Sequence, residues 1–328
     1  MVKKIITTLT LATAALVMAS CGGKVEYADT VNGVYFWGGV YDPNNEEQEF
    51  LKQNNIRKMY LRFFDVEECN YYVTEKYAPM YTLELRSKLP DSVEIIPTVF
   101  ITTSAIKDYK DYYQYLARRI YAMCDSYDIT PKEIQFDCDW TTSTRESFFA
   151  FLKDVRTELE QYFPGIRLSS TIRLHQLQQT PPPVDEGVLM CYNTGDFKDF
   201  DTKNSILDIK DVKPYLKYLK SYDLPLSLAL PTYDWVVEFD SDKKFSYLNN
   251  WVYFPADTVR VGENLWRYNN YDGSCNYMRH ETVSAKTILE TKDLVQKAYG
   301  KKMNIILYHL NSSQLKKYTN DEIENIYR

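Results

Sequence analysis

The stretch Glu133-Ile-Gln-Phe-Asp-Cys-Asp-Trp-Thr-Thr-Ser-Thr144 decides the fold, because it carries acidic side chains along a strand and then turns into a helix. Its polar and apolar residues alternate, and on a β-strand this sends the two sets to opposite faces. The polar set contains Asp137 and Asp139. Two carboxylates on one face of an otherwise apolar strand are costly to bury unless they are paired, hydrogen-bonded or shifted in pKa. Acids at the carboxyl end of such a strand are typical of the site of an α/β barrel.

The pattern after this strand predicts where the next helix begins. Ser143 and Glu146 have the Ser-x-x-Glu spacing of a capping box, in which the two side chains accept hydrogen bonds from backbone N–H groups of the first turn. Apolar residues then recur at helical spacing over 146–162, which predicts an amphipathic helix.

Segments with strand and helix patterns alternate along the whole chain. Strands are expected at 33–41, 56–65, 93–102, 133–140, 166–173, 187–193, 224–233 and 303–310. Helices are expected at 46–53, 77–88, 108–127, 146–162, 212–222 and 282–299, with room for only a helical stub within 175–184. This order predicts an α/β fold, a (β/α)8 TIM barrel forming a single domain over 31–328. A doubly wound sheet is the alternative, but no Gly-rich fingerprint follows any of these strands.

Residues 234–280 are too long for an ordinary connection after the seventh strand. Two strands, at 245–254 and 258–268, predict a β-hairpin-like insertion at the carboxyl face of the barrel. The insertion is rich in aromatic residues, namely Trp235, Phe239, Trp251, Tyr253, Trp266, Tyr268 and Tyr271. We expect most of these rings to form the insertion's own core, and one or two to stack on the apolar faces of sugar rings.

The first twenty residues have the pattern of a secretory signal. Lys3 and Lys4 precede an apolar run over 5–18, which ends in Ala19-Ser20-Cys21-Gly22. A cysteine at the cleavage point resembles a bacterial lipoprotein signal, which implies that Cys21 is lipidated and becomes the new N-terminus, followed by a tether over 21–30. The apolar run is too short to span a bilayer. We therefore expect an exported protein held by lipid at a bacterial membrane of the cell envelope, and the outer membrane is the expected one.

Charge and cysteine content narrow the kinds of partner. The net charge is −6, and removing Lys3 and Lys4 with the signal takes it to −8. An acidic chain without a Lys/Arg cluster argues against nucleic acid as a partner.

The five cysteines beyond the signal are widely spaced, so the sequence indicates neither a disulfide framework nor a zinc motif. Cys138 and Cys191 are expected to be small buried hydrophobic residues. No cofactor is expected, and the chain is expected to be a monomer.

Short motifs on three expected strands agree in order with one family. Asp137-Cys-Asp139-Trp140 resembles the Asp-x-Asp-x-Glu strand of glycoside hydrolase family 18, the chitinase group. Met190-Cys-Tyr192-Asn193 resembles that family's Met-x-Tyr-Asp, and Leu230-Pro231-Thr232-Tyr233 resembles its Pro-x-Tyr segment. The resemblance implies a (β/α)8 barrel with a glycan as ligand.

Three further segments resemble the domain of unknown function family 3142 more closely still. They are Ile134-Gln-Phe-Asp-Cys-Asp139, Leu168-Ser-Ser-Thr171 and Val184-Asp-Glu186. Together the two resemblances cover about 57–233.

This chain departs from the chitinase pattern where the chemistry is done. The resemblance implies a general-acid glutamate after Trp140, but Thr141 stands there, and its hydroxyl is far too weak an acid near neutral pH. The family's mechanism uses the substrate's acetamido group as nucleophile, so the acid and a supporting Asp are all that the protein need supply. Tyr308-His309-Leu310-Asn311 stands in place of the family's floor tryptophan, and Asn193 replaces an Asp. Glu146 is better explained as a cap than as a substitute acid.

Several hypotheses stay open for the site. Asp139, supported by Asp137, is the candidate catalytic residue, since two neighbouring carboxyls can raise a pKa. Alternatively the two acids form a buried network without chemistry. The candidate ligand-binding residues are Tyr192, Asn193, Tyr233, Trp235, Arg62 and Arg173. A metal site from His175, His309 and Asp139 is a further alternative, but no metal-binding spacing supports it.

Three functions follow from these hypotheses. The first is a lipid-anchored protein of glycoside hydrolase ancestry that binds or helps process a glycan without family 18 catalysis. The second is an active hydrolase that uses Asp139 with another carboxylate, such as Asp65 or Asp234. The third is a structural or interaction lipoprotein, whose barrel mouth should be filled by side chains.

Overall fold

The structure is a computed structural model that describes residues 30–69, 76–250, 252–269 and 273–328. The predicted signal, Cys21 and most of the predicted tether lie outside the described residues, as do Trp251 and Tyr271 of the insertion. Among the described residues, no helix combines the length and the apolar character needed to cross a membrane.

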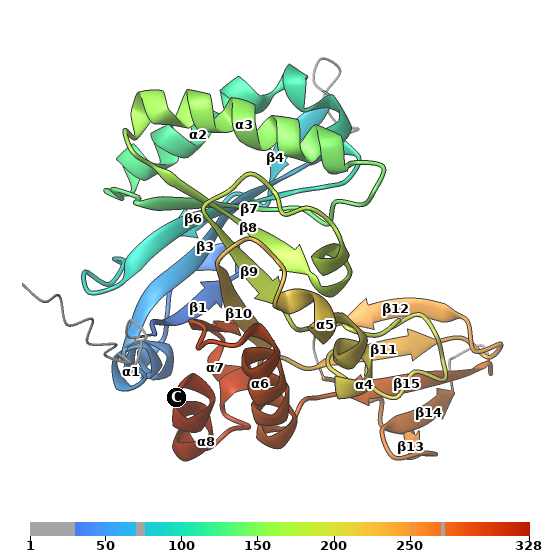
Figure 1. The fold of residues 1–328 in the computed structure, drawn as a ribbon. Coiled ribbons are helices and arrows are strands. Elements are labelled where there is room, and N and C mark those ends of the chain that lie inside the picture. The colour runs from blue at the N-terminus through green and yellow to red at the C-terminus, as the bar shows by residue number, and fades with distance from the viewer. Residues whose placement is uncertain (1–29, 70–75, 251, 270–272) are drawn as a thin grey trace, which may run out of the picture.

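Parallel strands close into a barrel within the described part of the chain (Figure 1). The eight strands are β1 (Asn32–Phe36), β3 (Ile56–Glu68), β6 (Glu94–Ile101), β7 (Glu133–Asp137), β8 (Arg167–Arg173), β9 (Glu186–Met190), β10 (Leu226–Pro231) and β16 (Ile305–Tyr308). The barrel closes because β1 pairs on one side with β16 and on the other with β3. The predicted (β/α)8 TIM barrel is confirmed.

Helices cover the outside of the barrel. They are α1 (Asn45–Gln53), the 3-10 helix η1 (Ala105–Asp111), α2 (Tyr113–Ser126), α3 (Arg145–Tyr162), α6 (Ala285–Tyr299) and α8 (Asn320–Tyr327). Shorter turns are η2 (Leu174–Gln178), α4 (Ile209–Val212), η3 (Lys213–Tyr215), α5 (Leu216–Leu219) and α7 (Ser312–Leu315). The expected helix at 212–222 is therefore broken into pieces around Pro214.

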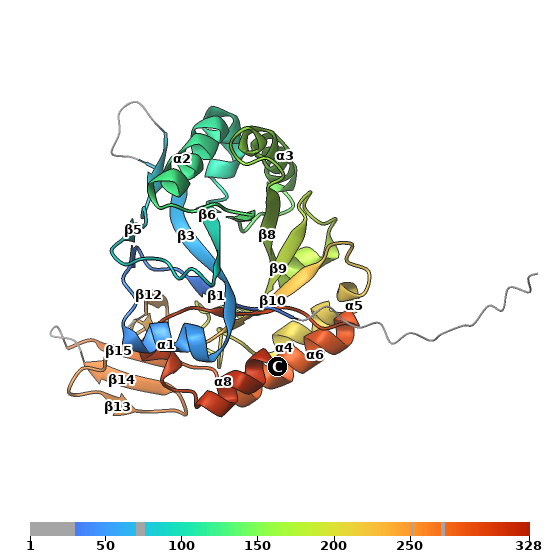
Figure 2. The ribbon, with the colours of Figure 1, turned by 90° about the vertical axis from the view of Figure 1, so that its left-hand side faces the viewer.

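The two chain ends of the barrel are held by buried contacts. Figure 2 shows α6 and α8 side by side along the lower edge of the molecule. The Lys292 ammonium, on α6, donates to the Asn325 and Ile326 carbonyls of α8 at 2.7 and 3.1 Å. The Tyr327 hydroxyl donates to the Gly33 carbonyl of β1 at 3.0 Å, which joins the last helix to the first strand.

Cys138 and Cys191 are buried, as the sequence predicted for small hydrophobic residues.

The prediction of a helix at 77–88 is wrong. Tyr77–Met80 forms strand β4, which pairs antiparallel with the end of β3, and Glu84–Leu85 forms β5, which pairs with β2 (Val40–Tyr41). Strand β3 runs beyond its expected end to Glu68 and so offers backbone partners to β4. Pro79 also disfavours a helix, because the residue before a proline is biased toward extended backbone.

The prediction of a capping box formed by Ser143 and Glu146 at the start of α3 is also wrong. The N-cap residue is Thr144, one position later than expected, and its side chain caps no backbone N–H of the helix. The Ser143 hydroxyl instead lies 2.9 Å from the Thr141 hydroxyl. Glu146 is exposed and accepts from Arg145 at 2.7 Å. The helix itself is confirmed, with Phe148, Phe151, Leu152, Val155 and Leu159 on its buried stripe.

The insertion after β10 is larger than the expected hairpin. It is an antiparallel sheet of five strands, β11 (Trp235–Phe239), β12 (Phe245–Asn249), β13 (Val259–Arg260), β14 (Leu265–Asn269) and β15 (Cys275–Glu281). Figure 1 shows it at the lower right, next to α4 and α5. Trp235 and Phe239 are buried, whereas Tyr253 is exposed, so only some of its rings form the insertion's own core.

Candidate functional site

A cavity of about 630 Å³ opens at the carboxyl ends of the barrel strands. We call it the cleft. All eight residues proposed from the sequence as catalytic or ligand-binding line it, although they come from five barrel strands, the loops after them and strand β11 of the insertion. They are Arg62, Asp137, Asp139, Arg173, Tyr192, Asn193, Tyr233 and Trp235. The structure thus brings the predicted set together, while the role of each residue stays a prediction. Trp37, Asp65, Asp234, Tyr308 and His309 also line the cleft.

Asp137 is the last residue of β7 and is 3% exposed. The Thr171 hydroxyl donates to its Oδ1 at 2.5 Å. Burial, and next to it the neighbouring charge of Asp139, raises the pKa of Asp137 to about 6, against the opposing effects of Arg173 and Thr171. Asp137 therefore holds a proton over part of the range just below neutral pH.

Asp139 forms a two-point ion pair with Arg173. The Arg173 Nε lies 2.5 Å from Oδ1 and Nη2 lies 3.1 Å from Oδ2. The same guanidinium lies over the Tyr192 ring, 5.9 Å from its centroid. A general acid must donate a proton to the leaving oxygen. Both oxygens of Asp139 here accept from Arg173, so the geometry favours the hypothesis of a structural network for this residue over that of a catalytic acid.

The other two carboxylates named as possible partners of Asp139 also line the cleft, and both are paired. Arg62 holds Asp65 at two points, with Nε 2.7 Å from Oδ1, and packs over Trp37 at 5.5 Å. Asp234 lies 3.3 Å from the His280 Nε2 and 4.0 Å from the Lys317 ammonium.

Two opposing effects act on the pKa of Asp234. Burial acts to raise it, but the hydrogen bond with His280 and the charge of Lys317 together lower it. Neither Asp65 nor Asp234 is an unpaired acid.

Aromatic rings pack around Tyr308 on the floor of the cleft. The centroid of the Tyr308 ring lies 5.0 Å from that of Tyr192, 5.6 Å from that of Tyr233 and 5.9 Å from that of Trp37. Tyr308 thus contributes aromatic surface at the last strand, where the resemblance to family 18 implies a tryptophan. Aromatic faces of this kind suit the C–H faces of sugars.

Two buried polar atoms of residues that line the cleft have no hydrogen-bond partner among the described residues. They are the Tyr192 hydroxyl and the His309 Nδ1. Burial raises the pKa of Tyr192 well above its usual value and lowers that of His309 to about 4, so the phenol is protonated and the imidazole neutral near neutral pH. The Tyr233 hydroxyl, by contrast, already donates to the Asn193 Oδ1 at 2.5 Å.

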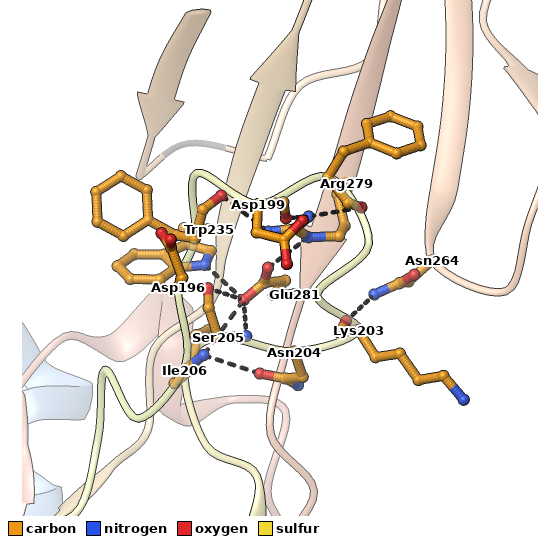
Figure 3. Close-up of polar contacts among 12 residues, drawn as sticks. Asp196, Asp199, Lys203, Asn204, Ser205, Ile206, Trp235, Asn264, Arg279 and Glu281 are labelled. Atoms are coloured by element: carbon orange, nitrogen blue, oxygen red, sulfur yellow. Dashed lines mark hydrogen bonds and ion pairs between the residues drawn. The ribbon is translucent and has the colours of Figure 1, made fainter. Parts of the chain in front are cut away.

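A buried carboxylate that sequence reasoning missed positions Trp235 (Figure 3). The Trp235 indole N–H donates to Glu281 at 3.0 Å. The same Glu281 oxygen accepts from the Ser205 N–H and hydroxyl, both at 2.6 Å, and from the Ile206 N–H at 3.2 Å. Its other oxygen accepts from Arg279 at 2.6 Å. Glu281 therefore joins the insertion to the loop that follows β9.

Arg279 strengthens the same junction. It is 1% exposed and donates to the backbone carbonyls of Asp199, Phe200 and Phe197 at 2.8, 3.1 and 3.0 Å. In the sequence, the charges of Arg279 and Glu281 are typical of an exposed segment, which is why sequence reasoning missed them. The one signal available was their spacing of two residues, which places both side chains on the same face of a strand.

Thr141, which stands where the resemblance implies the general acid, does not line the cleft. Strand β7 ends at Asp137, and Trp140 is fully buried. Thr141 is exposed, and its hydroxyl contacts the Ser143 hydroxyl at the start of α3. The period-2 rule applies only within the strand, and the chain has left the strand before residue 141.

The alternative of a metal site is not supported. Among the described residues, no three His, Cys, Asp or Glu side chains are grouped closely enough to hold a metal ion. His309 and Asp139 line the cleft, whereas His175 lies in η2 and does not.

Solved structures with a similar fold include chitinases and a spore cortex-lytic enzyme. A chitinase from Chromobacterium violaceum matches with a TM-score of 0.53 and 11% identity, over 91% of this chain and 98% of that chain. The Bacillus cereus spore cortex-lytic enzyme SleL matches with a TM-score of 0.52 and 16% identity, over 88% of this chain and 74% of that chain. A GH18 chitinase from Cycas revoluta in complex with (GlcNAc)3 matches with a TM-score of 0.50 and 11% identity, over 91% of this chain and 98% of that chain.

Comparisons by sequence add nothing to this likeness. No protein-family model matches the chain, and no curated protein matches it significantly. At such low identities the structural likeness establishes the fold alone: the chain has the (β/α)8 barrel of the GH18 chitinases.

Proposed function

We propose that this chain is an envelope-anchored protein of glycoside hydrolase ancestry that binds an oligosaccharide in the cleft without hydrolysing it by the family 18 mechanism. The observation that carries the proposal is the aromatic-walled cleft, in which Asp65, Asp139 and Asp234 are each paired with a basic side chain.

The form of the cleft favours a glycan as its ligand. Trp37, Tyr192, Tyr233, Trp235 and Tyr308 supply aromatic surface, as carbohydrate sites do. The paired charges leave neutral hydrogen-bonding groups for the ligand, and a chitinase of the same fold is bound to (GlcNAc)3. A purely structural protein should have a filled barrel mouth, so a cavity of about 630 Å³ counts against the scaffold hypothesis.

The side chains available for proton donation argue against family 18 catalysis. That mechanism needs an acid at the leaving oxygen, and the residue at the corresponding position is Thr141, whose side chain lies outside the cleft. Asp139 is occupied by Arg173. The chain thus keeps Asp137 and Asp139 but has no acid at position 141, where the family 18 mechanism needs one. This combination favours a binding protein that descends from an enzyme.

The anchor rests on the sequence of residues 1–22. The lipoprotein-type signal, with Cys21 as the lipidated residue, would hold the barrel at a bacterial envelope membrane, which we propose to be the outer membrane. Membership of the domain of unknown function family 3142 likewise stays a prediction from the short motifs of the fourth to sixth strands.

A second candidate function is hydrolysis with Asp137 as the acid. Its pKa of about 6 favours this alternative, because a carboxyl that holds a proton near neutral pH can act as a general acid. Its burial at 3% exposure and its bond with Thr171 oppose it.

One experiment separates these functions. The protein without residues 1–20, and its Asp139→Asn and Asp137→Asn variants, are incubated with a panel of glycans, and both binding and sugar release are measured. We expect binding without release. Release by the parent that is lost in Asp137→Asn would establish the second candidate, and release lost in Asp139→Asn alone would restore Asp139 as the acid. Absence of binding to every glycan would favour the scaffold.

A further inference from the structure

We propose that a second cavity, on the outer surface of the barrel between β4 and α2, binds a small amphipathic carboxylate. This outer cavity has a volume of about 780 Å³ and shares no lining residue with the cleft. The volume is within the usual range for small-molecule sites. The proposal concerns a different ligand from the glycan and does not depend on the proposed function.

The outer cavity lies where no helix of the described residues covers the barrel. Between β3 and β6 a (β/α)8 barrel has a helix, but the described residues there form only the strands β4 and β5 and irregular chain. Phe64 and Val66 of β3 point to the outside of the barrel and line the outer cavity together with β4 and α2. Figure 1 shows β4 next to the α2 and α3 layer at the top of the molecule.

Most of the outer cavity's lining is apolar or aromatic. Phe64, Val66, Ala78 and Leu116 contribute buried apolar side chains. The rings of Tyr77 and Tyr112 pack edge to face at 5.6 Å and add flat surface. Such walls suit the body of an acyl or aryl ligand, whose transfer from water is favourable.

The charged groups at the outer cavity favour an anionic end on that ligand. Its basic lining residues are Lys76, Arg118 and Arg119, and among the described residues that line it only Asp111 is acidic. Lys76 is paired with Asp108 at 2.6 Å. The overall charge of the chain is −6, so a basic cavity is a local feature and not a consequence of composition.

Arg119 is the group that a carboxylate would bind. Its Nε is buried without a hydrogen-bond partner among the described residues, while Nη2 donates to the Thr82 hydroxyl at 2.9 Å and the guanidinium lies 5.2 Å from the Phe64 centroid. A buried N–H without a partner is costly. A carboxylate is the natural partner for the guanidinium edge, and the adjoining apolar wall would hold its acyl or aryl body.

Calorimetric titration of the protein without residues 1–20 tests this site. The probes are decanoate, 2-naphthoate and the uncharged decanol. We expect saturable one-to-one binding of a carboxylate, and the tighter of decanoate and 2-naphthoate identifies an acyl or an aryl body. Arg119→Gln should weaken the carboxylate by about tenfold, since a hydrogen bond to a charged group is lost, with a much smaller effect on decanol.

Two further variants make the outcome decisive. Ala122 is exposed on α2 and lines the outer cavity, so Ala122→Trp should block every probe while leaving the fold intact. Arg145→Gln, at the exposed start of α3, is the matched control and should bind as the parent does. The proposal is overturned if neither carboxylate binds saturably, if Arg119→Gln binds as the parent does, or if a chito-oligosaccharide displaces the carboxylate.

Discussion

At the scale of single residues, the two acids of the central strand have different surroundings. Asp137 is buried, accepts from Thr171 and has a pKa of about 6. Asp139 is held by Arg173 at the edge of the cleft. The sequence predicted that both carboxylates share a face and need compensation. It could not assign the partners, because Thr171 and Arg173 are 34 positions away and come close only when β7 and β8 pair.

Asp137 should make the stability of the fold depend on pH. Its pKa is raised from 3.8 to about 6 in the folded state, so the unfolded chain releases this proton first, and the folded state loses stability as the pH rises from about 4 to 7. Asp137→Asn removes this loss. Relative to the variant, the parent should lose up to about 3 kcal/mol of unfolding free energy over that range.

Urea unfolding at several pH values measures this difference. Asp154→Asn, on the side of α3 that contacts η1, is the control, because the pKa of Asp154 is lowered by Lys110 and Tyr109 and its effect has the opposite sign. A parent and an Asp137→Asn variant whose stabilities change in parallel with pH would show that Asp137 is not a raised acid.

Placing a glutamate at position 141 should not create a hydrolase. The side chain of residue 141 lies outside the cleft and beside Ser143, so a carboxyl there cannot reach a bound glycan. Thr141→Glu should release no sugar from any glycan that the parent binds. Chromatography of the glycan after incubation checks this, and sugar release by the variant would mean that residue 141 faces the cleft.

At the scale of elements, the strands of the barrel could be predicted from the sequence and the additions to it could not. Hydrophobic alternation depends on local contacts and located all eight strands. The segment expected as a helix at 77–88 instead pairs with the extension of β3, a tertiary contact that overrides local pattern. Insertion strands as short as Val259–Arg260 carry too few residues for alternation to show.

The junction between the insertion and the loop after β9 depends on one buried carboxylate. Glu281→Gln should destabilise the protein by about 3 kcal/mol or more, because it removes the counter-charge of the buried Arg279. Thermal unfolding measures the loss. Glu290→Gln, in an exposed pair with Lys286 on α6, is the control and should change stability by less than about 0.5 kcal/mol.

The same variant should also disturb the cleft. Trp235 donates to Glu281, so its indole is expected to become more mobile, with a shifted fluorescence maximum. An unchanged melting temperature in Glu281→Gln would contradict the role given to this junction.

At the scale of the whole molecule, topology explains why eight residues scattered along the sequence line one cleft. In a closed parallel barrel the carboxyl ends of all strands meet at one face, so polar residues at strand ends converge whatever their distance in sequence. Sequence patterns could not reveal which acids would be paired with cations, nor that Thr141 turns away, because both depend on where each strand ends in space.

The proposed lipid anchor concerns the whole molecule, and the residues from which it is predicted lie outside the described part of the chain. The full-length chain, expressed in a bacterium, should incorporate labelled palmitate and partition into detergent, because an acyl chain adds about 0.8 kcal/mol of transfer free energy per buried CH₂ group. Cys21→Ala should abolish both. Ser20→Ala, which keeps a small residue before the cleavage point, is the control. Labelling that persists in Cys21→Ala would place the lipid elsewhere.

The central claim is that the cleft binds a glycan and does not cleave it. Its most direct test is calorimetric titration of the protein without residues 1–20 with chito-oligosaccharides and peptidoglycan fragments, with the sugar analysed for cleavage afterwards. The account predicts saturable binding of an intact glycan. Trp37→Ala, at the cleft wall, should weaken it by about tenfold, as loss of a stacking ring does, while Tyr121→Ala, on the outside of α2, should not. Cleavage of the sugar, or equal affinity of the parent and the Trp37→Ala variant for the glycan, would contradict the central claim.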